Sequence, residues 1–129
     1  MKQLLLVCLG GAAGSGARYL VGTWAQKAFA PGFPVGTLLV NVIGSFLIGV
    51  IMGLSLKTEA ISPAMRLFLA VGVMGGFTTY SSFNYETLRL ALEGAWRLAV
   101  LNVSVTLAAC AVAGVLGAAV ASFFAGFRV

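Results

Sequence analysis

The feature that most constrains this chain is a series of long stretches without any charged residue. Residues 28 to 56 contain no Lys, Arg, Asp or Glu, and the same holds for residues 67 to 85. A helix needs about 20 mostly apolar residues to cross a bilayer. Only 9% of the 129 residues are charged, whereas a soluble domain carries about 25%. The chain therefore has too few charges to cover a surface facing water, and we predict an integral membrane protein.

The charge-free stretches predict four transmembrane helices in a single domain over residues 1–129. Pro31 and Pro34 interrupt the chain before the second span, which we therefore start near Gly36. The predicted spans are residues 3–24, 36–56, 66–92 and 98–127. An even number of crossings places both termini on the same side. A cleaved signal peptide is the alternative for the N-terminus, but its apolar core is short and further apolar sequence follows it.

Glycines recur at a spacing that brings helices close together. Small residues four positions apart form a flat strip on which a neighbouring backbone can pack. Such pairs occur in the first, second and third spans: Gly10 and Gly14, Gly49 and Gly53, Gly72 and Gly76. Four closely packed helices leave no room for a water-filled pore inside one subunit, so a conduction path would need a second copy.

The eight Lys and Arg residues are divided almost evenly between the two predicted membrane faces. The face with the termini holds Lys2, Lys57, Arg66 and Arg128, and the other holds Arg18, Lys27, Arg89 and Arg97. The positive-inside rule needs an imbalance to set orientation. We therefore predict that the chain inserts in both directions and forms an antiparallel homodimer. Because these cations are scattered singly, a nucleic-acid partner is not indicated.

The composition also argues against several chemistries. The chain has no His and two Cys, so an ordinary zinc or haem site lacks its ligands. Its three acidic residues leave little for acid–base catalysis. We therefore expect a protein that is not an enzyme.

The third predicted span contains a segment that is poorly suited to a continuous helix. Two glycines are followed by β-branched and hydroxyl residues over residues 75–83. A helix broken near Gly75–Thr79 would free backbone groups, which a membrane tolerates only when protein, water or an ion satisfies them. The alternative is an unbroken helix with a packing face of small and hydroxyl residues. The composition alone does not separate the two.

Polar residues form stripes on three of the spans. They are Thr37, Asn41 and Ser45 on the second, Thr79, Ser82 and Glu86 on the third, and Asn102, Thr106 and Cys110 on the fourth. Residues at such spacing share one helix face. Each stripe could serve as interhelical hydrogen bonding, worth about 0.6 kcal/mol per contact. Three stripes around a suspected break favour a permeation path.

Charged residues within the spans are few. Only Arg18 and Glu86 qualify, and both lie toward span ends, where a side chain can reach the interface. Between them the path would be lined by hydroxyls, an amide and aromatic edges, which carry partial positive charge. This favours an anion over a cation without identifying the anion.

Three blocks of sequence closely resemble the Fluc (CrcB) family of fluoride channels. They are residues 14–19, residues 36–49 and residues 75–83, the last followed by Glu86. The second and third blocks are long and specific, and the resemblance covers essentially the whole chain in order. The fourth span resembles the family only in its general apolar character and has no matching block of sequence.

This resemblance implies a cell-membrane channel that expels cytoplasmic fluoride passively, through two pores in an antiparallel homodimer. By this resemblance Arg18 lies near a vestibule, and the carbonyls of Gly75 and Thr78 hold a structural sodium ion at the dimer centre. The implied pore residues are Asn41, Tyr80, Phe83, Thr79, Ser82, Thr106 and Glu86. The chain departs from the family at Tyr80, usually Phe, and at Cys110 and Gly114, where hydroxyls are common.

Two other functions remain open from the sequence. One is a small dual-topology exporter of cationic compounds, which would need a carboxylate deep in an early span. Neither residues 3–17 nor residues 36–56 contain one. The other is a structural membrane subunit, whose polar stripes would only hold the helices together.

Overall fold

A computed structural model describes residues 1–29 and 31–126, and in this part of the chain the regular secondary structure is all helical, without strands. Three of its helices are long and apolar enough to cross a membrane: α1 (Lys2–Ala28), α2 (Val35–Lys57) and α6 (Trp96–Gly126). The predicted spans 3–24 and 36–56 fall within α1 and α2. The predicted span 98–127 begins within α6, while residue 127 and Arg128 lie outside the described residues.

The segment between α2 and α6 is divided into four shorter helical pieces. They are α3 (Pro63–Arg66), the π-helix η1 (Leu67–Met74), α4 (Gly75–Phe77) and α5 (Tyr80–Leu92). Together they cover the predicted span 66–92, but none is long enough to join the three spanning candidates. The π-helix was not predicted, and nothing in its residue pattern distinguishes it from an α-helix.

The predicted break is present, and it is narrower than expected. Thr78 (φ −79°, ψ 158°) and Thr79 (φ −151°, ψ 116°) are extended, whereas Gly75 keeps helical angles (φ −61°, ψ −37°). The helix therefore ends after the glycine pair. The two β-branched threonines, whose side chains restrict the helical conformation, form the break themselves.

The predicted glycine pairs lie at close helix contacts. A Cβ added to Gly10 would come within 2.5 Å of the Phe68 carbonyl of η1, and one added to Gly14 would collide with the Val73 carbonyl. On the other side of the fold, a Cβ on Gly53 would lie 2.6 Å from the Ala121 Cβ of α6. The glycines thus let α1 approach η1 and α4, and let α2 approach α6.

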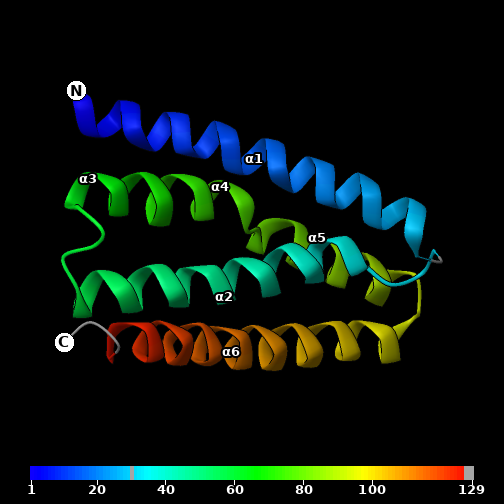
Figure 1. Cartoon of the computed structure of the whole chain (residues 1–129). Helices are drawn as coiled ribbons and strands as arrows, with labels where there is room; N and C mark the ends of the chain where they lie inside the picture. Colours follow the sequence, from blue (N-terminus) through cyan, green and yellow to red (C-terminus); the bar gives the residue numbers. More distant parts are fainter. Residues whose placement is uncertain (30, 127–129) are drawn as a thin grey trace.

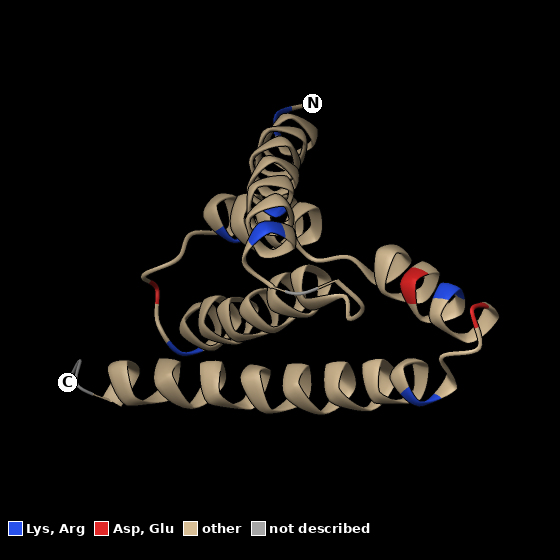
Figure 2. Cartoon of the chain, turned by 90° about the vertical axis from the view of Figure 1, so that its right-hand side faces the viewer, with Lys and Arg blue, Asp and Glu red and all other residues tan. Residues whose placement is uncertain are grey.

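The helices run back and forth along the molecule, as Figure 1 shows. The pieces η1 and α4 lie beside α1, and α2 lies between them and α6, whereas α5, which follows the break, packs directly against α6. The start of α1 and the end of α6 lie at the same end of the molecule, as expected for an even number of passes. Figure 2 shows most charged residues near helix ends and connections, with the middle parts of α2 and α6 uncharged, whereas α5 carries an acidic and a basic residue within the helix.

Candidate ion pathway

The structure brings most of the predicted pore residues to one groove beside the break. This groove, which we call the break groove, has a volume of about 380 Å³ and is lined by residues of α2, η1, α5 and α6. From the predicted set it contains Asn41, Thr79, Tyr80, Phe83 and Thr106, and it also contains Gly75 and Thr78. Segments separated by some 60 residues in the sequence therefore meet at one place.

Asn41 of α2 holds the break by a pair of hydrogen bonds. Its Nδ2 donates to the Thr79 carbonyl at 3.0 Å, and its Oδ1 accepts from the Thr79 backbone N–H at 2.8 Å. The side-chain amide thus replaces the backbone partners that Thr79 loses when the helix ends. The Nδ2 group has two N–H donors. One of them donates to the Thr79 carbonyl, and the other is not used in this pair of hydrogen bonds.

This arrangement changes the carbonyls just before the break. In an unbroken helix the Thr79 N–H would bond to the carbonyl of Gly75, four residues earlier. Because that N–H goes to Asn41 instead, the Gly75 carbonyl loses its helical donor. Gly75 is exposed, and a Cβ added there would meet nothing within 4 Å. The helix break therefore lies on an open side of the chain, with Gly75 lining the break groove.

Arg18 of α1 is directed to the break. Its Nη1 donates to the Thr78 carbonyl at 3.2 Å, across 60 residues of sequence. The resemblance to the channel family placed Arg18 near a vestibule. The spacing of residues in the sequence did not predict its contact with the Thr78 carbonyl. Arg18 lines neither the break groove nor the cavity described next.

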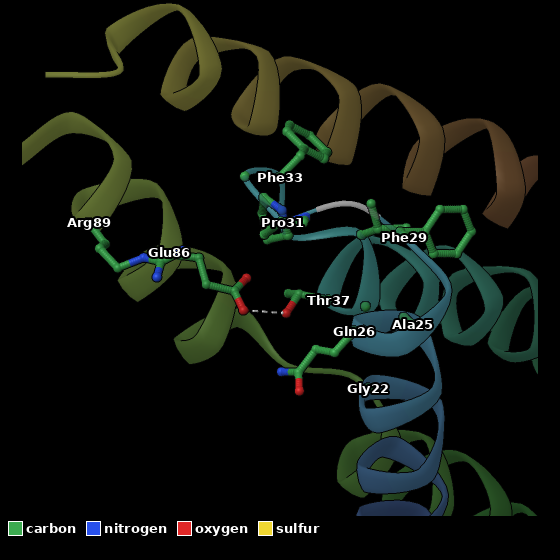
Figure 3. Close-up of a pocket in the computed structure, with 13 residues that line it drawn as sticks. Gly22, Ala25, Gln26, Phe29, Pro31, Phe33, Thr37, Glu86 and Arg89 are labelled. Carbon is green, nitrogen blue, oxygen red and sulfur yellow. Dashed lines mark hydrogen bonds between the residues drawn. The ribbon is translucent and has the colours of Figure 1, made fainter. Parts of the chain in front are cut away.

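A second cavity lies where α1 ends, α2 begins and α5 passes by. This mouth cavity has a volume of about 350 Å³ (Figure 3) and is lined by Gln26, Thr37, Glu86 and Arg89, among others. The Thr37 hydroxyl donates to Glu86 Oε1 at 2.8 Å. The other carboxylate oxygen, Glu86 Oε2, is buried and has no hydrogen-bond partner in the described part of the chain.

The predicted pore set is therefore divided between two places. Ser82 and Glu86 share another groove with Gln26 and Arg89, next to the mouth cavity. From the start of α5 the break groove contains Tyr80 and Phe83, whereas Ser82, which lies between them in the sequence, lines the other groove. Arg89 was missed as a candidate because a single Arg near a predicted span end is expected at the lipid headgroups.

The two aromatic residues of the third-span stripe lie side by side in different environments. The rings of Tyr80 and Phe83 have centroids 5.7 Å apart and planes tilted by 52°. Tyr80 is 76% exposed, whereas Phe83 is 7% exposed. The Phe83 ring is thus buried between α5 and the neighbouring helices. The Tyr80 ring projects from the exposed surface of the chain.

Thr79 also starts the helix that carries these rings. Its Oγ1 accepts from the Ser82 N–H at 3.1 Å, which is the usual N-cap contact. The same hydroxyl also donates to the Ser82 hydroxyl at 3.1 Å. Thr79 and Ser82, two members of the polar stripe on the third span, are therefore hydrogen-bonded to each other.

Apolar helices long enough to span a membrane, with polar groups collected around a broken helix, define a multi-pass membrane protein built for ion transport. Residues 5–118 match the family described as CrcB-like protein, Camphor Resistance (CrcB). The chain belongs to this family, as its resemblance to fluoride channels had indicated.

Similar proteins extend the match to nearly the full chain. A protein of Anaeromyxobacter sp. (strain K) is 58% identical over 126 residues, which cover 98% of this chain and 100% of the relative. One from Anaeromyxobacter dehalogenans is 57% identical over the same coverage. One from Sorangium cellulosum is 54% identical over 121 residues, covering 94% of this chain and 95% of the relative. Each bears the name Fluoride-specific ion channel FluC.

Proposed function

We propose that this protein is a fluoride-selective ion channel, which lets fluoride leave the cytoplasm passively and so reduces its toxicity. The observation that carries the proposal is the break groove, where Asn41, Thr79, Tyr80, Phe83 and Thr106 lie together. The similar proteins are named for the same activity. The protein is accordingly a channel and not an enzyme.

The chemistry of the groove suits a small, strongly hydrated anion. Hydroxyls, an amide and aromatic edges can replace the water around fluoride with several weak donors. A fixed cation in the groove would hold the ion tightly and slow its exit, while conduction needs binding that is weak enough to reverse. Lys and Arg are absent from the residues that line the groove.

We propose that the path is completed by a second copy in the opposite orientation. The break groove lies on the outside of the protomer, and Tyr80 projects there with 76% of its surface exposed. The near-even division of cations between the two faces supports insertion in both directions, with Arg128 lying outside the described residues. We propose that the series α3 to α5 serves as the fourth crossing, which gives four spans in total. We also propose that the protein is located in the cell (inner) membrane.

Orientation can be measured directly with a reporter fused to the C-terminus. Dual topology predicts that the reporter is found on both sides of the membrane in similar amounts. A reporter found on one side only would rule out the antiparallel homodimer. A variant with additional Lys residues near one terminus provides the control with fixed orientation.

We propose that a structural sodium ion sits between the two copies, held by the carbonyls of Gly75 and Thr78. The Gly75 carbonyl fits this role because Asn41 takes its helical donor. The Thr78 carbonyl accepts from Arg18 and retains a second lone pair. Backbone carbonyls at helix breaks are known to coordinate sodium in membrane proteins. Replacing sodium with a large organic cation should shift the purified protein from dimer to monomer, and an unchanged elution volume would rule this ion out.

The function is tested with purified protein in liposomes loaded with potassium fluoride. A fluoride electrode outside the liposomes records efflux after valinomycin is added to carry the potassium. A fluoride channel predicts rapid loss that follows the membrane potential. No loss of fluoride, or loss that depends on a proton gradient and a cationic drug, would contradict the proposal and favour a structural subunit or the exporter.

A further inference from the structure

Helix α6 contains a buried amide that the ion pathway described so far does not use. Asn102 is only 1% exposed and lies one helical turn before Thr106. Burying an amide away from water costs free energy unless its polar atoms are hydrogen-bonded. The side chain meets this requirement with Nδ2, which donates to the Thr87 hydroxyl of α5 at 2.8 Å.

Thr87 passes this contact on to the backbone of the buried aromatic residue. Its hydroxyl accepts from Asn102 and donates to the Phe83 carbonyl, also at 2.8 Å. A hydroxyl has one proton, so Thr87 has a defined orientation. The Asn102 amide is thereby connected to the peptide group that carries the Phe83 ring.

The other end of the same amide faces the second wall of the break groove. The Thr106 hydroxyl donates to Asn102 Oδ1 at 3.4 Å. Thr106 and Phe83 both line the groove, whereas Asn102 and Thr87 do not. A single buried side chain therefore links a wall residue of α6 to a wall residue of α5.

The bonds of this chain differ in length. The contacts to Thr87 and Phe83 are 2.8 Å long, within the range of good hydrogen bonds. The Thr106 contact, at 3.4 Å, is longer than that range. The α5 end is therefore firmly held, while the Thr106 proton can turn to an anion in the groove at small cost.

We propose that Asn102 is a positioning residue for fluoride passage, acting through Thr87 on Phe83 and through Thr106 on the groove. It fixes α5 against α6 so that the Phe83 ring stays in place, and it keeps the Thr106 hydroxyl directed along the wall. The inference rests on the proposed fluoride channel and extends it to residues outside the groove. A role limited to holding the helices together would change stability and leave ion selectivity as it is.

The most informative variant is Thr87→Val, which removes the hydroxyl and nearly preserves the shape of the side chain. We expect fluoride efflux to fall about fivefold, the effect of losing a hydrogen bond of ordinary strength, and the fluoride-to-chloride permeability ratio to fall with it. Thr87→Ser retains the hydroxyl and should rescue both. Asn102→Leu should lower both at least as much, because it also removes the Thr106 contact. The double variant should be no worse than Asn102→Leu alone, because both substitutions break the same chain.

The matched control is Asn84→Leu, the same substitution at an exposed position of α5. It should keep both the efflux and the permeability ratio of the unchanged protein. If Thr87→Val and Asn102→Leu fold normally and keep the original permeability ratio, the positioning role is wrong. The same conclusion follows if Thr87→Ser fails to rescue.

A measurement without fluoride separates this inference from the proposed function. Backbone hydrogen exchange over residues 80–92 should be faster in Thr87→Val and Asn102→Leu than in the unchanged protein, and unchanged in Thr87→Ser and Asn84→Leu. Equal exchange in all variants would overturn the link between Asn102 and α5. If the unchanged protein passes no fluoride, the proposed function fails, while the exchange result still decides whether Asn102 holds this helix.

Discussion

The break groove and the mouth cavity are similar in volume and differ in the polar groups that line them. The break groove has an amide, hydroxyls and aromatic rings, without a charged side chain. The mouth cavity has Glu86 and Arg89 beside Gln26 and Thr37 (Figure 3). In the break groove, Asn41 is hydrogen-bonded to the backbone of Thr79, while Arg89 at the mouth cavity is exposed and lies 3.9 Å from Glu93.

This difference assigns the two regions separate tasks. Neutral donors held in place around a desolvated ion discriminate between anions by size and hydration. A charged opening changes the local concentration of ions, and this effect is screened by salt over about 10 Å at 0.1 M. We therefore attribute selectivity to the break groove and entry to the mouth cavity. Substitutions in the groove should have large effects, and those at the mouth should have small ones that depend on salt.

The largest effect is expected for Asn41→Asp. The substitution keeps the shape of the side chain but replaces the Nδ2 donor with an oxygen. One carboxylate oxygen can still accept from the Thr79 N–H, while the other faces the Thr79 carbonyl and places a negative charge beside the incoming anion. Fluoride efflux should fall by more than about a hundredfold, as expected for a charge introduced into a low-dielectric site. Ser45→Ala, which changes a residue of the same groove one turn away on α2 without adding a charge, is the control and should reduce efflux far less. Efflux within about twofold of the unchanged protein would remove Asn41 from the pathway.

Phe83→Ile should also abolish fluoride passage, while the protein remains folded. The ring forms part of the groove wall, and its partially positive edge cannot be replaced by an aliphatic side chain. Phe124→Ile, a change to an exposed phenylalanine of α6, provides the control with unchanged efflux. If Phe83→Ile conducts fluoride as well as Phe124→Ile does, the aromatic edge plays no part in passage.

The backbone around the break should be intolerant of added volume. In Gly14→Ala the new methyl group would collide with the Val73 carbonyl and lie 2.9 Å from the Phe77 nitrogen. We expect the substitution to destabilise the protein by about 1–3 kcal/mol and to lower efflux by displacing α4. Gly16→Ala, where a Cβ meets nothing within 4 Å, is the control, and thermal unfolding in detergent compares the two. Equal midpoints would show that α1 and η1 are less closely packed than described.

How much of the site could be predicted from the sequence depends on whether a feature is local or tertiary. The stripe of Thr37, Asn41 and Ser45 and the glycine spacing depend on helix periodicity, which is local and can be read from the chain. The contact of Arg18 with the Thr78 carbonyl cannot be read in this way. It depends on how two helices are packed and on the reach of a long side chain.

The break itself shows where pattern reasoning ends. A helix broken near Gly75–Thr79 was predicted, because glycine and β-branched residues disfavour helices. The glycines proved to be helical, with Gly76 packed closely on the Gly11 backbone. Which residues leave the helix is decided by Asn41, which offers hydrogen bonds to Thr79 and to no residue before it. That choice depends on tertiary structure.

The smallest effect is expected for Arg89→Gln at the mouth cavity. Losing one exposed cation should lower fluoride efflux about twofold at low ionic strength, and the difference should disappear near 1 M salt, where the screening length is about 3 Å. Arg97→Gln, at the start of α6, changes the same charge away from the residues that line the mouth cavity and should have no effect. A loss that persists in high salt would mean that Arg89 contributes to selectivity, against the division of tasks.

The most direct test of the account is the reversal potential of the purified protein in a planar bilayer. With about a tenfold gradient of fluoride and equal chloride on both sides, a fluoride-selective channel should reverse at about 59 mV in magnitude, the fluoride equilibrium potential. The break groove accounts for such selectivity without any fixed charge. A current that reverses near zero would show that chloride, which has no gradient, carries most of the current, and would contradict the account.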